Sequence, residues 1–376
     1  MKKLLLLCHL APALLLNAIC FAQQQQRVTL AIGSPAPDFS LRGIDGKNYS
    51  LSSFKNAKLL VIIFMCNHCP TSQAYEQRII QLTNDYKAKG VAVAGINPNN
   101  PTSLRLDELG YSDVGDSYDD MKLRAKDAGF NFPYLYDGET EATSNKYGPV
   151  STPHVFIFDS ERKLRYQGRV DDTEDPHKTP NSTDARNAIE ALLNNQPVPV
   201  ETTKVFGCSI KWLEKKDWLQ KAAIKWAKEP VDLYLAGEDS IKGLLKNSSD
   251  KLRLICLWSA SSAASVKEFP FFITMHHMYR DRGFEFMSIN IDSTGGKNKL
   301  LAFLKAHQAS GPNYLFTGAQ RSSLVNALTP QWNGTTPCTL LVEPGGKVVY
   351  TRYGMLNPEE LRKIIFFNPM MGRIYN

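Results

Sequence analysis

Apolar positions along the first half of the chain follow two alternating patterns, one typical of buried strands and one of amphipathic helices. Residues 58–65 (KLLVIIFM) are almost continuously apolar, as expected of a strand whose two faces are both covered. A helix is predicted at 71–90, where a glycine ends it, and a second buried strand at 91–97 (VAVAGIN). The same reading predicts a hairpin from residues 155–159 and 163–170 and a helix at 184–194. Residues 102–120 are acidic and are expected to be irregular.

The second half repeats this plan. A strand is predicted at 251–258 (KLRLICLW), then a helix from about 263 to 281, and then a strand at FEFMSINID. STPHVFIFDSERKLRY in the first half corresponds to TTPCTLLVEPGGKVVY in the second, with lysine and tyrosine at matching distances after the proline. We infer a duplicated architecture. The predicted fold class is α/β, with two tandem folds that each have a central mixed sheet flanked by helices.

At 376 residues, the chain is too long for one ordinary hydrophobic core. We expect one domain at residues 33–211, a linker helix at 212–231 and a second domain at 232–376. The linker region is rich in lysine, and its apolar face carries Trp212, Leu219, Ala223 and Trp226. Acidic residues dilute the lysine face, which favours packing of the tryptophans on a neighbouring domain over binding to a membrane surface.

Residues 1–22 have the pattern of a signal peptide. Two lysines precede an apolar stretch, and Cys20-Phe21-Ala22 forms a small-x-small cleavage site. We expect cleavage near Ala22 and export, in a bacterium to the periplasm; an uncleaved anchor is the alternative, and no other membrane contact is expected. The net charge of +7 is mild, and no dense basic stretch with interleaved aromatic residues indicates a nucleic-acid partner.

Seven cysteines are present, and two of them lie in the predicted signal peptide. The remaining five are Cys66, Cys69, Cys208, Cys256 and Cys338. Their odd number and uneven spacing do not indicate a disulfide scaffold.

The motif FMCNHCP places Cys66 and Cys69 at a predicted junction between a strand and a helix. A helix N-terminus stabilises a thiolate, and a thiolate attacks disulfides. We therefore predict a redox pair in which Cys66 attacks and Cys69 resolves the mixed disulfide. His68 is expected to tune the thiolate by electrostatic stabilisation.

Other chemistry at this motif is less well supported. Zinc needs two more ligands, and neither a second Cys-x-x-Cys nor a His-x-x-x-His occurs. Covalent haem needs histidine after the second cysteine, where Pro70 stands. The peroxidatic pattern Pro-x-x-x-Thr/Ser-x-x-Cys fits neither cysteine. Two buried structural thiols are a further alternative. No metal and no bound cofactor are expected.

Several motifs in residues 33–212 resemble the peroxiredoxin-like (AhpC/TSA, redoxin-type) branch of the thioredoxin superfamily. In order, they are SPAPDFSLRGIDGKNYSLSSF, FMCNHCP, GINPNN, STPHVFIFD, QGRVDD and FGCSIKW. The resemblance implies a thioredoxin-like fold with redox-active Cys66 and Cys69. It also implies that Pro153 is a cis proline facing the cysteines, and that the backbone of Thr152 binds an extended substrate segment. Cys208, in the last motif, is either a third exchanging thiol or a small residue in a docking turn.

The stretch LWSASSAASVKEFP resembles the active-site region of TlpA-like periplasmic thioredoxins. That alignment puts Ser262 and Ser265 where the two cysteines belong, and Pro337 as the second cis proline. Serine cannot form a disulfide, so the second domain is expected to be degenerate and without redox activity. Cys256 is expected to be inert and Cys338 to be buried beside the lost site.

These observations predict an exported thiol–disulfide oxidoreductase. Its substrate would be a protein or small-molecule thiol or disulfide, with a separate reductant or oxidant protein as partner. A thiol-dependent peroxidase is one alternative. A peptide-binding protein that is not an enzyme, with a structural disulfide, is the other.

Overall fold

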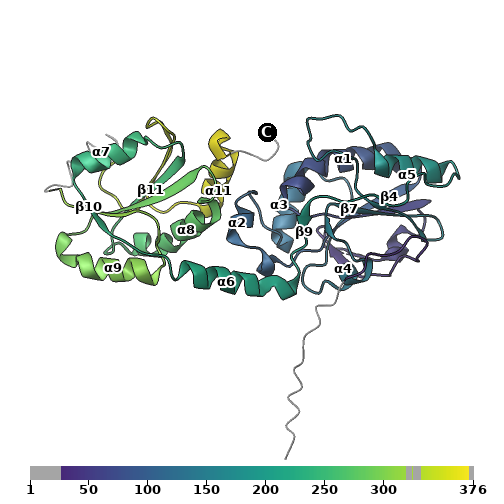
Figure 1. Cartoon of the computed structure of the whole chain (residues 1–376), viewed down its shortest axis with the longest axis horizontal. Coiled ribbons are helices and arrows are strands. Elements are labelled where there is room, and N and C mark those ends of the chain that lie inside the picture. Colours follow the sequence, from purple (N-terminus) through teal and green to yellow (C-terminus); the bar gives the residue numbers. More distant parts are fainter. Residues whose placement is uncertain (1–26, 319–323, 325–331, 372–376) are drawn as a thin grey trace, which may run out of the picture.

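The structure of the chain is a computed structural model that describes residues 27–318, 324 and 332–371. The predicted signal peptide, residues 1–22, lies outside the described residues. Two sheet–helix bodies lie end to end, and helix α6 (Asp217–Trp226) spans the distance between them on one side (Figure 1). We refer to these bodies as the first and the second domain; the exact boundaries stay a prediction.

The first domain is built on a seven-stranded mixed sheet in the order β2-β1-β5-β4-β3-β7-β8. Strands β3, β4 and β5 run parallel, β7 is antiparallel to β3, and β7 and β8 form the predicted hairpin. The strands are β1 Leu41–Gly43, β2 Asn48–Tyr49, β3 Leu59–Phe64, β4 Val91–Asn97, β5 Tyr134–Tyr136, β7 His154–Phe158 and β8 Leu164–Gly168.

The second domain has a six-stranded sheet in the order β10-β13-β12-β11-β14-β15. Its last five strands have the same order and directions as β5-β4-β3-β7-β8, so the predicted tandem α/β fold is confirmed. The strands are β10 Tyr234–Ala236, β11 Leu252–Trp258, β12 Phe284–Asn290, β13 Asn313–Phe316, β14 Cys338–Val342 and β15 Val348–Tyr353.

Both central strands are buried on two faces, which explains their continuous apolar sequences. On β3, Val61 and Ile63 pack under α1 and α5, whereas Leu60, Ile62 and Phe64 pack in a separate core on the opposite face. The helices are α1 Pro70–Lys87, α2 Leu106–Leu109, α3 Tyr118–Ala128, α4 Ala142–Tyr147, α5 Asp184–Leu193, α7 Glu238–Lys246, α8 Ala263–Tyr279, α9 Lys297–Ala306 and α11 Pro358–Phe367. Short 3-10 helices are η1 Leu51–Phe54, η2 Pro101–Ser103, η3 Leu213–Lys216, η4 Thr294–Gly296 and η5 Pro369–Met371.

The acidic stretch 102–120 is more ordered than the sequence predicts. It contains α2 and the first residues of α3, and α2 packs against α8 of the second domain. Gly110 ends α2 so close to α8 that a Cβ atom there would lie 2.3 Å from the carbonyl oxygen of Met278. The guanidinium of Arg282 donates to the carbonyl of Gly110 and lies 4.4 Å from the ring centre of Tyr111. This stretch therefore forms much of the contact between the domains.

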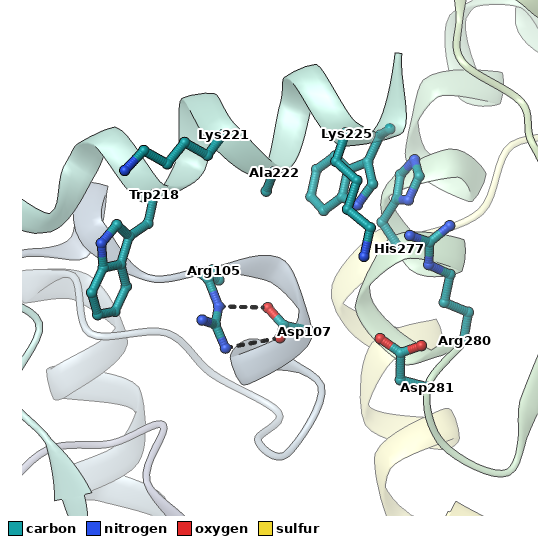
Figure 2. Close-up of a pocket in the computed structure, with 10 residues that line it drawn as sticks. Arg105, Asp107, Trp218, Lys221, Ala222, Lys225, His277, Arg280 and Asp281 are labelled. Atoms are coloured by element: carbon teal, nitrogen blue, oxygen red, sulfur yellow. Dashed lines mark hydrogen bonds and ion pairs between the residues drawn. The ribbon is translucent and has the colours of Figure 1, made fainter. Parts of the chain in front are cut away.

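Helix α6 is shorter than the predicted linker helix because η3 precedes it. Trp226 stacks on His277 of α8 with ring centres 4.2 Å apart, and Trp212 lies under the guanidinium of Arg27 at 3.7 Å. The two tryptophans thus fix opposite ends of the linker to different domains. Trp218 and Lys225 of α6 line a cavity of about 360 Å³ together with residues of α8 and of the α2 region. Figure 2 shows these side chains. Among the described residues, no helix is both long and apolar enough to span a bilayer.

Candidate functional site

The first cysteine motif lies between the end of β3 and the start of α1. Cys69 is the N-cap residue of α1, and its sulfur accepts a hydrogen bond from the backbone N–H of Ser72. Pro70 follows at the first helical position, where its missing N–H costs nothing. Cys66 lies three residues before the cap, with its backbone N–H donating to Oγ of Ser72. The sequence analysis assigns the stabilised thiolate to Cys66, but the residue at the N-terminus of the helix is Cys69, because the helix begins at Pro70.

Cys69 is disulfide-bonded to Cys208, with 5.9 Å between the Cα atoms. This pairing differs from the predicted Cys66–Cys69 disulfide, and Cys66 is present as a buried thiol. The Cys66 sulfur lies 3.0 Å from Oγ1 of Thr152, and the Cys69 sulfur lies 3.5 Å from the Thr152 carbonyl oxygen. Three cysteines therefore converge on Thr152. Spacing alone did not show Cys208 as a partner because 139 residues separate it from Cys69.

Thr152 and Pro153 lie beside the cysteines as the resemblance implies, and the peptide bond between them is cis. Ser151 and Thr152 form strand β6, which pairs antiparallel with β9 (Cys208–Ser209). Thr152 is directly opposite Cys208 in this pairing. The backbone predicted to bind a substrate segment is thus paired with a segment of the same chain.

His68 forms a buried ion pair with Asp116. The distance between Nδ1 of His68 and Oδ2 of Asp116 is 2.6 Å, and both side chains are almost completely buried. Burial opposes a charged imidazole, but the carboxylate of Asp116 and, after it, the nearby Cys66 raise the pKa of His68 to about 10. Burial likewise opposes ionisation of Asp116, yet the His68 charge holds the pKa of this carboxyl below its usual value. The predicted tuning residue therefore carries a positive charge at neutral pH.

Asp116 is a site residue that the sequence did not identify. The sequence predicts only an irregular acidic stretch here, whereas this carboxylate is fully buried. It accepts hydrogen bonds from the backbone N–H groups of Asn67 and His68 and from the side chain of Asn99. Nothing in the sequence distinguishes Asp116 from Asp119 and Asp120, which follow it on the same stretch. Only the fold brings this one carboxylate to the cysteine motif.

Cys66, His68 and Asp116 each place one potential ligand atom within 4.8 Å of the others. A metal ion there would compete with the proton that joins His68 to Asp116. The hydrogen bonds around the carboxylate are complete without an ion, so the arrangement fits an ion pair beside a thiol better than a metal centre.

Cys208 is the most accessible of the three cysteines, since Cys66 and Cys69 are both buried and Cys208 is half-buried. It lines a cavity of about 370 Å³ at the junction of the two domains. His68 and Lys211 of the first domain and Met278 and Arg282 of the second contribute to the same wall. A thiol reagent that approaches through this cavity meets Cys208 first.

The second domain repeats the backbone arrangement of the first site without its sulfur atoms. Ser262 is the N-cap of α8, accepts from the backbone N–H of Ser265 and donates to the carbonyl of Thr336. These contacts match those of Cys69 with Ser72 and Thr152. Ser262 therefore corresponds to Cys69, and Ser265 corresponds to Ser72.

The position of Cys66 is held in the second domain by Ser259, whose backbone N–H donates to Oγ of Ser265. The counterparts of Cys66 and Cys69 are thus Ser259 and Ser262. The pair predicted from the TlpA-like alignment, Ser262 and Ser265, is three residues further along the chain. Asp292 accepts from the backbone N–H of Ala260, as Asp116 does from that of Asn67. A carboxylate thus accepts from the corresponding backbone in both domains, although Asp292 follows β12 where Asn99 follows β4 and does not correspond in position to Asp116. Both thiols and the histidine are missing from the second site.

Pro337 follows a cis peptide bond, and Cys338 and Cys256 lie on neighbouring strands behind it. Burial raises the pKa of the Cys338 thiol to about 12 and that of Cys256 well above its usual range. Neither thiol is poised for attack, because attack requires the thiolate.

Comparison with known proteins agrees with this geometry. Residues 31–189, most of the first domain, match the model of the Redoxin family. The chain is 23% identical over 142 residues to the thiol-disulfide oxidoreductase ResA of Geobacillus thermodenitrificans, a match that covers 37% of this chain and 70% of ResA. By its fold and its relatives, the chain is therefore a thioredoxin-like protein that is similar to thiol–disulfide oxidoreductases.

Two solved structures are more similar in sequence. A conserved protein of uncharacterised function from Geobacillus kaustophilus is 36% identical, and the match covers 48% of this chain and 92% of that one, with a TM-score of 0.44. A hypothetical protein from Sinorhizobium meliloti is 29% identical over 49% of this chain and 96% of that one, also with a TM-score of 0.44.

Proposed function

We propose that this protein is an exported thiol–disulfide oxidoreductase with three cysteines at its site. One disulfide moves between two pairs of them. The observation that carries the proposal is the Cys69–Cys208 disulfide beside the Cys66 thiol, all three at Thr152. Export follows from the predicted signal peptide. The substrate is a thiol or disulfide of a protein or a small molecule, and a second redox protein restores the starting state.

The geometry supports roles for Cys66 and Cys69 that differ from the predicted ones. Cys69 lies at the helix N-terminus, where the backbone N–H of Ser72 stabilises a departing thiolate. We therefore assign the mixed disulfide with substrate to Cys69. Cys66 is the resolving thiol, and it lies beside the His68–Asp116 ion pair.

The first step moves the disulfide within the protein. Cys66, as a thiolate, attacks the sulfur of Cys69, so that a Cys66–Cys69 bond forms while the Cys69–Cys208 bond breaks. The Cys208 thiolate leaves and takes up the proton that Cys66 gave up. No electrons are gained or lost, and the product contains the pair that the Cys-x-x-Cys motif predicts.

The second step passes two electrons between substrate and protein. A substrate thiolate attacks Cys69, and Cys66 leaves as a thiolate; a second substrate thiolate then attacks the bound substrate sulfur, and Cys69 leaves. The substrate gains a disulfide, and the two protein thiolates take up two protons. The reverse sequence reduces a substrate disulfide, and the relative reduction potentials set the direction.

Two variants that each keep one of the three site thiols test the function and the roles. Cys66→Ser/Cys208→Ser keeps Cys69, and Cys69→Ser/Cys208→Ser keeps Cys66. After acid quenching and alkylation of cells, we expect mixed disulfides to accumulate mainly on the variant that keeps Cys69. The triple serine variant is the control for adducts at Cys256 and Cys338. Accumulation on Cys66 alone would reverse the roles, and adducts on neither would refute the proposed function.

One contact favours a peroxidase as the second candidate. The hydroxyl of Thr152 is 3.0 Å from the Cys66 sulfur and is placed to orient a peroxide there. Attack on hydrogen peroxide would give water and a Cys66 sulfenic acid, which a neighbouring thiol would condense to a disulfide with loss of a second water. Consumption of peroxide coupled to a thiol reductant distinguishes this activity from disulfide exchange.

A structural disulfide in a peptide-binding protein is the competing explanation without catalysis. The two possibilities differ in the reduction potential of Cys69–Cys208, because structural disulfides in secreted proteins have potentials below about −300 mV. A value well above that limit supports exchange. A value below it, with no adducts in the trapping experiment, supports the binding protein.

A further inference from the structure

The segment that carries Cys208 lies against the backbone of Thr152 as a short strand. Thr152 is opposite Cys208 and Ser151 is opposite Ser209 in the antiparallel pairing of β6 with β9. Cys208 is also bonded to Cys69 at the start of α1. An extended segment that pairs with Thr152 and carries a cysteine bonded to Cys69 has the geometry of a mixed disulfide between this site and a peptide.

We propose that residues 204–209 are an internal occupant of the groove in which an extended, cysteine-bearing segment of a substrate protein binds. A substrate enters by replacing this segment, with its own cysteine in the place of Cys208. This inference rests on the proposed function and adds the substrate class to it. The groove takes a polypeptide strand, because the backbone of Ser151 and Thr152 recognises backbone and not a small thiol.

Gly207 sets a requirement for the residue before the cysteine. Its φ is +136°, and a Cβ atom there would lie 2.1 Å from the carbonyl oxygen of Thr152. No side chain fits this position while the strand is paired with Thr152. A substrate that binds in the same register must therefore have glycine directly before its reactive cysteine.

Two apolar positions flank the cysteine at a spacing of two residues. Phe206 is partly buried against the core of the first domain, with its ring centre 6.2 Å from that of Tyr75, and Ile210 is almost completely buried. Backbone pairing provides affinity in such strand additions, and pockets for alternate side chains provide specificity. The favoured substrate sequence is apolar-Gly-Cys-x-apolar.

The internal segment is held firmly at both ends and more loosely between them. On one side, Oγ1 of Thr203 accepts from the backbone N–H of Arg169. On the other side, the backbone N–H of Lys211 donates to Asn99, and its ammonium lies 2.6 Å from Glu108. Once the disulfide has moved to Cys66–Cys69, residues 204–209 lose their covalent link to the site and are held by the two-residue strand pair and the packing of Phe206. The position of the disulfide therefore controls whether the groove is occupied.

A peptide copy of the segment tests this inference on the full-length chain. The protein variant is Cys66→Ser/Cys208→Ser, so that Cys69 is the site thiol. The probe is a peptide of residues 204–212 whose cysteine is bonded to thionitrobenzoate; attack by Cys69 joins peptide to protein and releases the coloured thiolate. A second peptide carries Gly207→Ala, and cysteamine bonded to thionitrobenzoate is the probe without a peptide backbone. We expect the glycine peptide to react about tenfold faster than the alanine peptide.

The protein itself offers a second measurement. Gly207→Ala in the same background keeps the internal segment out of the groove, so the glycine peptide should react several-fold faster. The increase is roughly the inverse of the fraction of time for which the groove is free when residue 207 is glycine. Gly129→Ala is the matched control: Gly129 has a φ of +74° but no atom within 4 Å of an added Cβ. Circular dichroism of both variants checks that they fold, and the peptide comparison does not depend on them.

The outcomes separate this inference from the proposed function. Equal rates for the two peptides, with a normal rate for the cysteamine probe, would overturn the strand groove and leave Cys69 as a redox thiol. Failure of Cys69 to react with any of the three probes would overturn both. Faster reaction of the glycine peptide alone, increased by Gly207→Ala in the protein, supports the groove.

Discussion

His68 and Asp116, 48 residues apart in the sequence, form a buried ion pair with 2.6 Å between nitrogen and oxygen beside the Cys66 thiol. The carboxylate reaches the site from the stretch that also carries α2, the helix in contact with the second domain. Electrostatics at the cysteine motif and contact between the domains therefore depend on one short segment.

Asp116→Asn should both destabilise the protein and slow the chemistry of Cys66. Without the carboxylate, burial dominates and the pKa of His68 falls, so the imidazole is neutral at pH 7. Loss of one partner of a buried ion pair typically costs about 3 kcal/mol or more of unfolding free energy. We expect a loss of this order in urea denaturation and a several-fold lower rate of iodoacetamide alkylation of Cys66 in the Cys69→Ser/Cys208→Ser background.

Asp119→Asn is the matched control for that substitution. Asp119 lies three residues further on, and its side chain is 86% exposed in a surface pair with Lys122. This variant should change the unfolding free energy by less than about 1 kcal/mol and leave the alkylation rate unchanged. Equal effects of the two substitutions would show that the buried pair has no special role.

Stability should fall as the pH rises from neutral towards 10, because of His68. Its pKa in the folded protein is about 10, above the ordinary value of 6.5, so the folded state binds the proton more tightly. The stabilisation is complete below about pH 6.5 and is lost as the pH rises through about 10. A single such group contributes a slope of at most about 1.4 kcal/mol per pH unit.

Urea denaturation of the wild-type chain and of His68→Asn across this pH range measures the effect. Other groups also titrate above pH 8, so the informative quantity is the difference between the two proteins. We expect this difference to shrink steadily from pH 7 to pH 10. A difference that is constant with pH would mean that His68 is not protonated in the folded state.

Much of the architecture could be predicted from local patterns, because it depends on residues close together in the chain. Continuous apolar runs identified β3 and β11, and the Thr-Pro repeat located the two cis prolines. The partner of Cys69 and the partner of His68 could not be predicted in this way. Both are set by distant segments, Cys208 in the last motif and Asp116 in an acidic stretch, that only the folded chain brings to the site. A local motif indicates that a thiol is reactive, but it does not indicate which distant residues surround that thiol.

The correspondence between the two sites predicts where a thiol would be reactive in the second domain. Ser262→Cys places sulfur at the N-cap of α8, as Cys69 is at the N-cap of α1. Ser265→Cys is the matched control, because Ser265 is buried within the first turn. In the Cys66→Ser/Cys69→Ser/Cys208→Ser background, we expect Ser262→Cys to react with dithionitrobenzoate at least about tenfold faster than Ser265→Cys. Faster reaction of Ser265→Cys would mean that helix position does not govern thiol reactivity in this domain.

Gly110→Ala should loosen the contact between the domains and, through it, the redox site. An added Cβ would lie 2.3 Å from the Met278 carbonyl, which is backbone of α8 and cannot move aside alone. Relief of this clash requires α2 to move away from α8, and the same stretch carries Asp116. We expect a larger radius of gyration in small-angle X-ray scattering and faster proteolysis near α2. Alkylation of Cys66 should also change in the Cys69→Ser/Cys208→Ser background. Gly129→Ala, where an added Cβ would have no atom within 4 Å, should change none of these. An altered scattering profile with unchanged Cys66 reactivity would show that the second domain is attached to the first without influencing its chemistry.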